Sequence, residues 1–455
     1  MSEYTVGIDS IALHIPKPYL DLQGEWLKAR APIFTSNDEN KLVSKLNKSI
    51  GITKMAVPDA HEDPATMGAM AIKNLLDANQ IDLKEVGHIA VATESGVDHS
   101  KSISSSIIGM LGLHYQDQSN HIGAIEYKFA CVSSTYALEA GLSLLESPRY
   151  NYPYLIVVCT DVAKYRLEEN AEYTQGAGAV ALLLSKNPRL LSIDNKPMGT
   201  FTLDEYDFYR PLWSDYPMVD GKHSLSVYNK SLIEAYKRFV ANDKKESNAA
   251  NHFDHFLFHV PFPNMSRYAA AELLYSEQLQ AINDPLERKN HLKELLNSES
   301  FKSFFDNKIE PALGLSKEIG NIYTGSLYLA LVSLIENAKN NDIELKNNKA
   351  VFLAYGSGSS SKVFSGEFKK EWKKVALQNN WQQKLADVEN GGIRKSLTLE
   401  QYEKLHAQAG NITVKKELEN LTSIFNPNQE FVFQGTSKDS LPGKRIYRYI
   451  YKTSC

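Results

Sequence analysis

Short apolar runs alternate along the chain with segments in which Leu and Ala recur at helical spacing. Two such segments, residues 65–78 and 135–147, predict helices. Five apolar runs are nearly continuous and predict strands that are buried on both faces: residues 88–95, 154–161, 178–185, 253–260 and 350–357. The alternation of strands and helices indicates an α/β fold.

A weak internal repeat relates two distant parts of the chain. Residues 131–146 (CVSSTYALEAGLSLLE) align in register with residues 321–336 (NIYTGSLYLALVSLIE) at four identical positions. In each copy, a strand ending in a reactive side chain precedes the helix, and this side chain is Glu94 in the first copy and His259 in the second. This repeated order predicts an internally duplicated α/β unit, with functional residues where strands end and helices begin.

We place the boundary between the two halves after residue 189. The first half, residues 1–189, contains Glu94 and Cys131. The second half, residues 190–455, contains His259 and Asn321. A chain of this length is long enough for two such units.

The second half carries two additions to the predicted unit. A charged helical pattern over residues 275–318 predicts an insertion, and after residue 366 the composition turns charged, which predicts a structural rather than chemical C-terminal extension. Within the extension, Thr398 and Gln401 form a capping box for a helix, and the alternating RIYRYIYK predicts a late strand.

Composition excludes several classes of function. The 455 residues are 43% hydrophobic and 23% charged, a globular balance, and the net charge of −4 gives no field for nucleic acid. The N-terminus lacks a basic, apolar leader, and no apolar run is long enough to span a membrane. The three cysteines favour a reducing compartment, so we expect a cytoplasmic protein without a disulfide framework.

Cys131 and Glu94 are the first candidates for chemistry. If Cys131 begins a helix, the helix dipole favours its thiolate, which is a good nucleophile for a thioester. The alternative is a small buried packing residue. Glu94 closes an apolar strand, so partial desolvation would raise its pKa and make it a usable general acid or base. The alternative is a strand-end carboxylate that faces water.

His259, Asn321 and a glycine-rich turn complete the candidate set. His259 ends a predicted strand and would project from the carboxyl edge of the sheet, although a core histidine is the alternative. Its neighbour His255 is expected to face solvent. No carboxylate or cysteine lies at ligand spacing, so we expect no metal. Asn321 matches Cys131 in the repeat, and backbone N–H groups of YGSGSSS (355–361) could line an oxyanion hole.

Cys, His and Asn together fit two chemistries. One is a papain-like hydrolase, in which His activates Cys and Asn orients His. The other is carbon–carbon bond formation on acyl thioesters, which needs an acyl-holding nucleophile, a base and oxyanion donors. The internal duplication and the additional carboxylate of Glu94 favour the second chemistry.

The motifs around these residues resemble the 3-hydroxy-3-methylglutaryl-CoA synthase family of the thiolase superfamily. The resemblance covers most of the chain and thins out after residue 366. It is carried by TESGVDHSKS, EYKFACVSSTYAL, YTQGAGAVALLL, YDFYRP, YPMVDGK, FHVPF and GNIYTGSLYLAL. It implies a thiolase-like fold with layers in the order αβαβα. The cysteine motif departs from the family in lacking an aromatic residue directly after Cys131.

The resemblance also implies a reaction, the Claisen-type condensation of acetyl-CoA with acetoacetyl-CoA in the mevalonate pathway to isoprenoids. Cys131 would carry the acetyl group, Glu94 would act as acid and base, and His259, supported by Asn321, would polarise the acetoacetyl carbonyl. The implied substrate contacts are Thr174, Ser224, Asn321, Ser357, Asp38 and, for the CoA phosphates, Arg267. No cofactor beyond the thioesters is implied, and a homodimer is expected.

Two rival functions stay open. The nearer is a β-branching synthase that acts on a β-ketoacyl chain bound to an acyl carrier protein in polyketide assembly. The other is a non-catalytic acyl-binding paralogue, which the intact set of Glu94, Cys131 and His259 disfavours.

Overall fold

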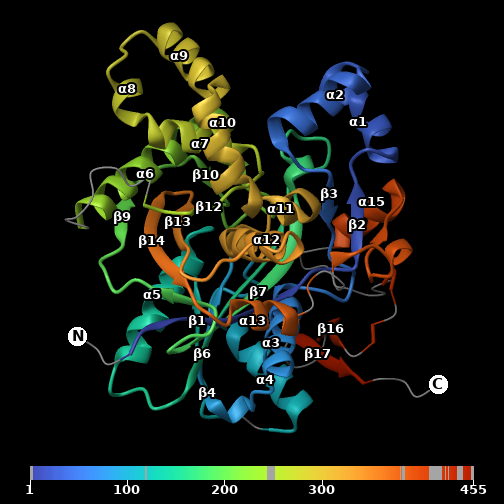
Figure 1. Cartoon of the computed structure of the whole chain (residues 1–455). Coiled ribbons are helices and arrows are strands. Elements are labelled where there is room, and N and C mark those ends of the chain that lie inside the picture. Colours follow the sequence, from blue (N-terminus) through green and yellow to red (C-terminus); the bar gives the residue numbers. More distant parts are fainter. Residues whose placement is uncertain are drawn as a thin grey trace.

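A ten-stranded mixed sheet forms the centre of the molecule (Figure 1). The computed structural model describes residues 4–117, 120–242, 252–379, 381, 385–408, 423–425, 427–428, 430–437 and 444–451. The sheet consists of β1 (Val6–His14), β4 (Val86–Ala92), β5 (Gly123–Tyr127), β6 (Tyr154–Ala163), β7 (Gly176–Lys186), β8 (Leu191–Ile193), β9 (Gly199–Thr202), β12 (His255–Phe258), β13 (Lys349–Gly356) and β14 (Ser360–Phe368). Their order is β12-β13-β14-β8-β1-β7-β6-β4-β5, with β9 paired to β14.

The two halves of the sheet repeat one pairing pattern. In the first half, β4 is parallel to β6, and β6 and β1 are both antiparallel to β7. In the second half, β12 is parallel to β13, and β13 and β8 are both antiparallel to β14. The halves join where β1 pairs with β8. The predicted internal duplication is therefore confirmed.

The two halves of the sheet form two layers. Helices on the two outer faces and between the halves form the other three layers. α3 (Pro64–Asn79) and α4 (Ile103–Tyr115) cover the outer face of the first half, while α5 (Ser133–Glu146) and α12 (Ser326–Asn340) lie between the halves. The outer face of the second half is covered by α6 (Gly221–Asn242), α7 (Met265–Leu274) and α10 (Glu299–Lys308). This arrangement confirms the αβαβα order.

The layers explain why the strands read as continuous apolar runs. Side chains alternate between the two faces of a strand, and both faces of these strands are covered. In β6, Val157 and Cys159 pack toward the central helices, while Ile156 and Val158 pack toward α3 and α4. An apolar residue is therefore needed at every position.

The strand predicted over residues 253–260 is shorter than expected. β12 ends at Phe258, because prolines at 261 and 263 cannot donate to a ladder and stop the strand just beyond it. The expectation that His255 faces solvent is wrong, since it is buried within β12 and its Nε2 lies 3.2 Å from Asn348 Nδ2.

The predicted insertion is helical, as expected. It contains α8 (Ser276–Gln280), α9 (Pro285–Asn297), α10 and α11 (Gly314–Ile319). At the other end of the second half, α13 (Trp372–Asn379) packs against α12 and α3.

A separate lobe combines N-terminal and C-terminal segments. β15 (Lys395–Ser396), β2 (Pro18–Asp21) and β3 (Lys54–Ala56) form a small sheet, and α15 (Leu399–Gln408) shares an apolar cluster with α1 (Glu25–Thr35) and α2 (Glu39–Lys45). The predicted capping box is present, since Thr398 Oγ1 accepts from the Gln401 amide at 3.2 Å and Gln401 Oε1 accepts from the Thr398 amide at 3.0 Å.

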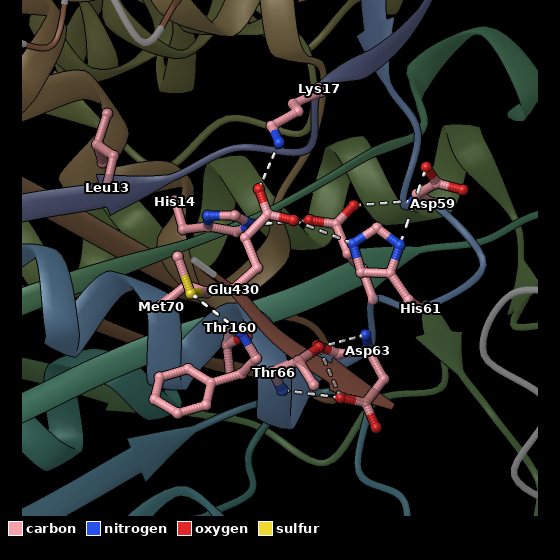
Figure 2. Close-up of polar contacts among 12 residues, drawn as sticks. Leu13, His14, Lys17, Asp59, His61, Asp63, Thr66, Met70, Thr160 and Glu430 are labelled. Atoms are coloured by element: carbon pink, nitrogen blue, oxygen red, sulfur yellow. Dashed lines mark hydrogen bonds and ion pairs between the residues drawn. The ribbon is translucent and has the colours of Figure 1, made fainter. Parts of the chain in front are cut away.

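The C-terminal hairpin docks on the loop that precedes α3 (Figure 2). The hairpin consists of β16 (Glu430–Thr436) and β17 (Arg445–Ile450), which confirms the predicted late strand. Glu430 accepts a hydrogen bond from Lys17 and lies 3.4 Å from His61 Nε2, while Arg445 donates to Asp63 at 2.6 Å. Although burial raises the pKa of Glu430, His61 and Lys17 together lower it to about 2, so this contact stays ionised.

No helix in the described ranges combines the length and the apolar content that crossing a bilayer requires.

Candidate active site

Glu94 lies in a turn that a buried carboxylate holds at the end of β4. Asp161 in β6 accepts hydrogen bonds at Oδ1 from the amides of Glu94 (2.8 Å) and Ser95 (3.0 Å) and from the Thr93 hydroxyl (3.0 Å). Asp161 is fully buried, and its Oδ2 accepts from the Thr324 amide at 3.1 Å and from the Thr324 hydroxyl. One side chain therefore ties Glu94 to the start of α12.

Cys131 lies just before the first turn of α5, and Asn321 lies just before the 3₁₀ turn Tyr323–Gly325 that leads into α12. The residue before each has a left-handed backbone, with φ of 44° at Ala130 and 83° at Gly320. For Ala130 this conformation is strained, so the surrounding packing must hold it. The repeat thus extends to the backbone that presents Cys131.

The Cys131 thiol lies beside the Glu94 carboxyl group and packs against the apolar cluster of Ala163, Tyr165 and Tyr323. Cys131 is partly exposed, and Glu94 Oε1 is buried with no hydrogen-bond partner among the described residues. The alternative that Cys131 is only a packing residue does not explain this pairing. Cys159, in contrast, is fully buried in β6.

The electrostatics of this pair differ from the expectation. Burial and the Glu94 charge raise the pKa of the Cys131 thiol well above its usual value, so the prediction that the helix start favours the thiolate is wrong. A helix dipole contributes only about 0.3–1 kcal/mol, which burial beside a carboxylate outweighs. Burial and the neighbouring Asp161 raise the pKa of Glu94 to about 8, as predicted from its place at a strand end.

His259 directly follows β12 and is buried. Its amide donates to Leu353 O at 2.9 Å, and its carbonyl accepts from the Tyr228 hydroxyl at 2.7 Å. Burial lowers the pKa of its imidazole to about 3, so the ring is neutral, and Nδ1 has no hydrogen-bond partner in the described part of the chain. A neutral imidazole can donate one hydrogen bond and accept another.

Asn321 and Thr174 are in direct contact. The Asn321 amide donates to the carbonyl of the buried Thr174 at 3.2 Å. Asn321 Oδ1 accepts from the Tyr323 amide (2.8 Å) and the Ser326 hydroxyl (3.0 Å), which leaves its NH2 group for contact with His259 or a substrate carbonyl.

Asp207 organises the glycine-rich turn after β13. It is fully buried and accepts from the Gly358 amide (2.9 Å), the Tyr355 hydroxyl (2.7 Å) and the Ser224 hydroxyl (3.2 Å). It therefore brings Ser224 to the same turn as Ser357.

The same turn lies directly against the Cys131 loop. A Cβ on Gly356 would lie 2.7 Å from the Val132 nitrogen and 2.9 Å from the Phe129 carbonyl oxygen, so only glycine fits there. This contact places Ser357, one residue further on, next to the segment that carries Cys131.

Glu94, Tyr323 and Ser357 line a cleft of about 730 Å³. β10 (Phe208–Tyr209), which pairs with β11 (Met218–Val219), contributes to its wall. Arg210 also lines the cleft and donates a hydrogen bond to the Glu94 carbonyl. The volume is that of a small-molecule site.

Asp38 and Arg267 are not among the described residues that line this cleft. Asp38 is exposed and caps α2 by accepting from the Lys41 amide at 2.9 Å. Arg267 donates to Leu296 O at 2.9 Å, and its guanidinium lies 5.2 Å from the centre of the Phe305 ring.

Sequence reasoning missed Asp161 and Asp207. Each carried a signal, since Asp161 ends the apolar run 154–161 and Asp207 lies in the motif YDFYRP. A charge in or beside a buried segment requires partners, and these partners come from distant segments.

Two family models account for nearly the whole chain. The hydroxymethylglutaryl-coenzyme A synthase N-terminal model matches residues 3–188, and the C-terminal model of the same enzyme matches residues 191–439. The chain belongs to the hydroxymethylglutaryl-CoA synthase family. The resemblance read from the motifs is thereby confirmed, and members of this family are condensing acyltransferases.

Individual family members agree with this assignment. The hydroxymethylglutaryl-CoA synthase of Haloferax volcanii is 30% identical, over 98% of this chain and 99% of its own. The structure of MvaS in complex with 3-hydroxy-3-methylglutaryl coenzyme A superposes with a TM-score of 0.82, covering 99% of this chain and all of MvaS at 26% identity. The HMG synthase of the curacin biosynthetic pathway (TM-score 0.78, 24% identity, 98% of this chain and all of its own) shares the fold.

Proposed function

We propose that this synthase condenses acetyl-CoA with acetoacetyl-CoA to give 3-hydroxy-3-methylglutaryl-CoA and CoA through an acetyl group on Cys131. The observation that supports the proposal is the pairing of Cys131 with Glu94, which lines a small-molecule cleft. The pKa of Glu94, about 8, suits an acid–base role near neutral pH.

In the first step, the Cys131 sulfur attacks the acetyl carbonyl of acetyl-CoA. The bond from that carbon to the CoA sulfur breaks, the thiol proton moves to the departing sulfur, and free CoA leaves. The backbone N–H groups of Cys131 and Ser357 are the proposed donors to the oxyanion, because the Gly356 contact holds their two loops together.

In the second step, the Glu94 carboxylate removes a proton from the acetyl methyl group, and the resulting carbanion attacks the ketone carbon of acetoacetyl-CoA. Glu94 then returns the proton to the new alkoxide. His259, supported by the Asn321 NH2 group, polarises the ketone, as its neutral state allows. Water finally hydrolyses the thioester, which releases the product and restores the Cys131 thiol.

The remaining predicted contacts are part of the proposal in two groups. Thr174, Ser224 and Ser357 would contact the substrates, since each adjoins Asn321 or the glycine-rich turn. Asp38 would contact the substrate and Arg267 the CoA phosphates, and in each case the ligand must compete with the residue's present partner. No metal or further cofactor takes part in these steps.

The proposal also divides the chain into two halves after residue 189 and places the reaction in the cytoplasm.

The second candidate function uses a substrate bound to an acyl carrier protein. The curacin pathway synthase, which shares this fold, has been solved in complex with its donor carrier protein. The 30% identity to the Haloferax volcanii enzyme over nearly the full chain favours CoA substrates. The test incubates purified enzyme with acetyl-CoA and acetoacetyl-CoA and follows loss of the enolate absorbance. Turnover with a carrier-protein thioester but not with acetoacetyl-CoA would reject the proposal.

Replacing Asp161 by Asn should change both stability and pH dependence. Asn presents an NH2 group to several donors, so the free energy of unfolding should fall by about 1–3 kcal/mol. Glu94 acts as a base when ionised, so the condensation rate rises with pH through its pKa. Asp161 raises that pKa, so Asp161→Asn should move the rising limb to lower pH. Denaturant titration and a kcat–pH profile measure these effects.

Asp207→Asn is the matched control for Asp161→Asn. Asp207 is equally buried and accepts three hydrogen bonds, so its loss should also lower stability. It is not among the groups that shift the pKa of Glu94, so the limb should stay in place. If the rising limb of the kcat–pH profile does not move in Asp161→Asn, the role assigned to Asp161 in raising the pKa of Glu94 is contradicted.

A homodimer is proposed through the free edge of β5. β5 ends the sheet, and only its β4 side is paired within the described residues. Its Ile125 is 42% exposed, so a second copy could extend the sheet and cover this side chain. Ile125→Glu should convert a dimer to a monomer in light scattering, whereas Leu286→Glu, on the exposed face of α9, should not. A monomeric wild type, or a dimeric Ile125→Glu, would reject this interface.

A further inference from the structure

α15 carries two buried polar side chains on one face. Tyr402 and His406 are four residues apart and therefore lie side by side on the helix. The helix belongs to the C-terminal extension, yet Figure 1 shows it beside β2 and β3, which come from the N-terminal part of the chain. Buried polar groups require partners, and both side chains find theirs around the active site.

His406 holds the main chain of Tyr165. Its Nε2 lies 2.8 Å from the Tyr165 carbonyl and 3.1 Å from Gln175 Oε1. Both neighbours are acceptors, so Nε2 carries the proton and donates. Burial, with repulsion from Lys164, lowers the pKa of His406 to about 4, so the ring stays neutral and this donor persists across the working pH range.

Tyr402 fixes the side chain of Gln175, which in turn holds the backbone amide of Tyr165. Gln175 Oε1 accepts from the Tyr165 amide at 2.6 Å, and Gln175 Nε2 donates to the Tyr402 hydroxyl at 2.7 Å. The Tyr402 hydroxyl in turn donates to Glu172 Oε1 at 3.3 Å. Glu172 is itself fixed by Arg30 Nε at 3.0 Å. Each hydrogen bond in this network therefore has an assigned donor and an assigned acceptor.

Tyr165 is part of the wall against which Cys131 packs. Its ring forms a cluster with Tyr323 and Ala163, and Cys131 and Phe208 contact that cluster. Gln175 also follows Thr174, whose carbonyl accepts the Asn321 amide. α15 therefore touches both segments that border the proposed acetyl site.

We propose that Tyr402 and His406 are positioning residues that hold the Tyr165 wall closed over the acetyl group on Cys131. This rests on the proposed acetyl-Cys131 intermediate. Loss of either hydrogen bond lets Tyr165 shift and admits water. Water then attacks the acetyl carbonyl, the carbon–sulfur bond breaks, acetate leaves, and the thiol regains a proton. The extension thereby commits the acetyl-enzyme to condensation rather than hydrolysis.

The test compares Tyr402→Phe and His406→Leu with wild type. For each we measure hydrolysis of acetyl-CoA without acetoacetyl-CoA, and kcat and KM for condensation. A small displacement near a reacting group is costly, so the hydrolysis-to-condensation ratio should rise roughly 10- to 100-fold while KM for acetyl-CoA changes little. Tyr402→Phe keeps the ring, and His406→Gln keeps an N–H donor and should restore most of the wild-type ratio.

Thr398→Ala is the matched control, because it removes the α15 cap without touching Tyr165. It should lower the melting temperature and leave the ratio unchanged. A wild-type ratio in both Tyr402→Phe and His406→Leu, or an equal rise in Thr398→Ala, overturns the inference. Absence of acetyl on Cys131 in wild type, by mass spectrometry, would instead overturn the proposed function.

Discussion

Cys131→Ala should lose both acetyl-enzyme formation and condensation. The acetyl group has no other attachment point in the proposed reaction, and removal of a nucleophile typically lowers kcat by about 10,000-fold or more. Incubation with labelled acetyl-CoA, followed by proteolysis and mass spectrometry, should place the label on the peptide containing Cys131 in wild type and nowhere in the variant.

Cys159→Ala provides the control for that experiment. Cys159 is fully buried in β6, so its replacement should preserve labelling while lowering stability through the cavity it leaves. Labelling of Cys131→Ala at the wild-type rate would show that another group carries the acetyl. A folded Cys131→Ala, checked by circular dichroism, is required for either conclusion.

Glu94→Gln should separate the two halves of the reaction. The amide cannot remove the methyl proton, so condensation should fall by about 100- to 10,000-fold, the usual contribution of a general acid–base. Acetylation should persist, because loss of the Glu94 charge removes one cause of the raised pKa of the Cys131 thiol. Labelled acetyl-enzyme should therefore accumulate in the presence of acetoacetyl-CoA.

Glu126→Gln is the matched carboxylate control. Glu126 lines the same cleft but accepts from the Ile103 amide at 2.7 Å, away from the Cys131 pair. Its replacement should leave condensation within a small factor of wild type. A papain-like hydrolase predicts the reverse for Glu94, since turnover would then barely respond to Glu94→Gln. That outcome would favour the hydrolase.

The order of elements was readable in the chain because it depends on local patterns. Strands buried on both faces must be apolar at every position, so five of them stood out, and their ends located Glu94 and His259. The repeat between residues 131–146 and 321–336 predicted the duplication, since equivalent helices keep similar faces against the same kind of sheet. The family motifs were equally local.

The protonation states were decided only by the tertiary structure. The helix start near Cys131 argued for a thiolate, but the paired Glu94 and burial reverse that direction. Neither effect is visible in a linear pattern, because desolvation and charge pairing depend on segments that meet in space. Asp161 is the clearest case, since its contacts join Glu94 to Thr324, 230 positions away along the chain.

The sequence by itself determined the layered fold, the family and the candidate residues for the reaction. Only the tertiary structure decided how those residues are poised, because pKa values and positions follow from burial and from distant partners. The C-terminal extension shows the difference most plainly. Its composition indicated a structural tail, and its capping box a helix, but nothing in its pattern placed Tyr402 and His406 behind the wall that faces Cys131.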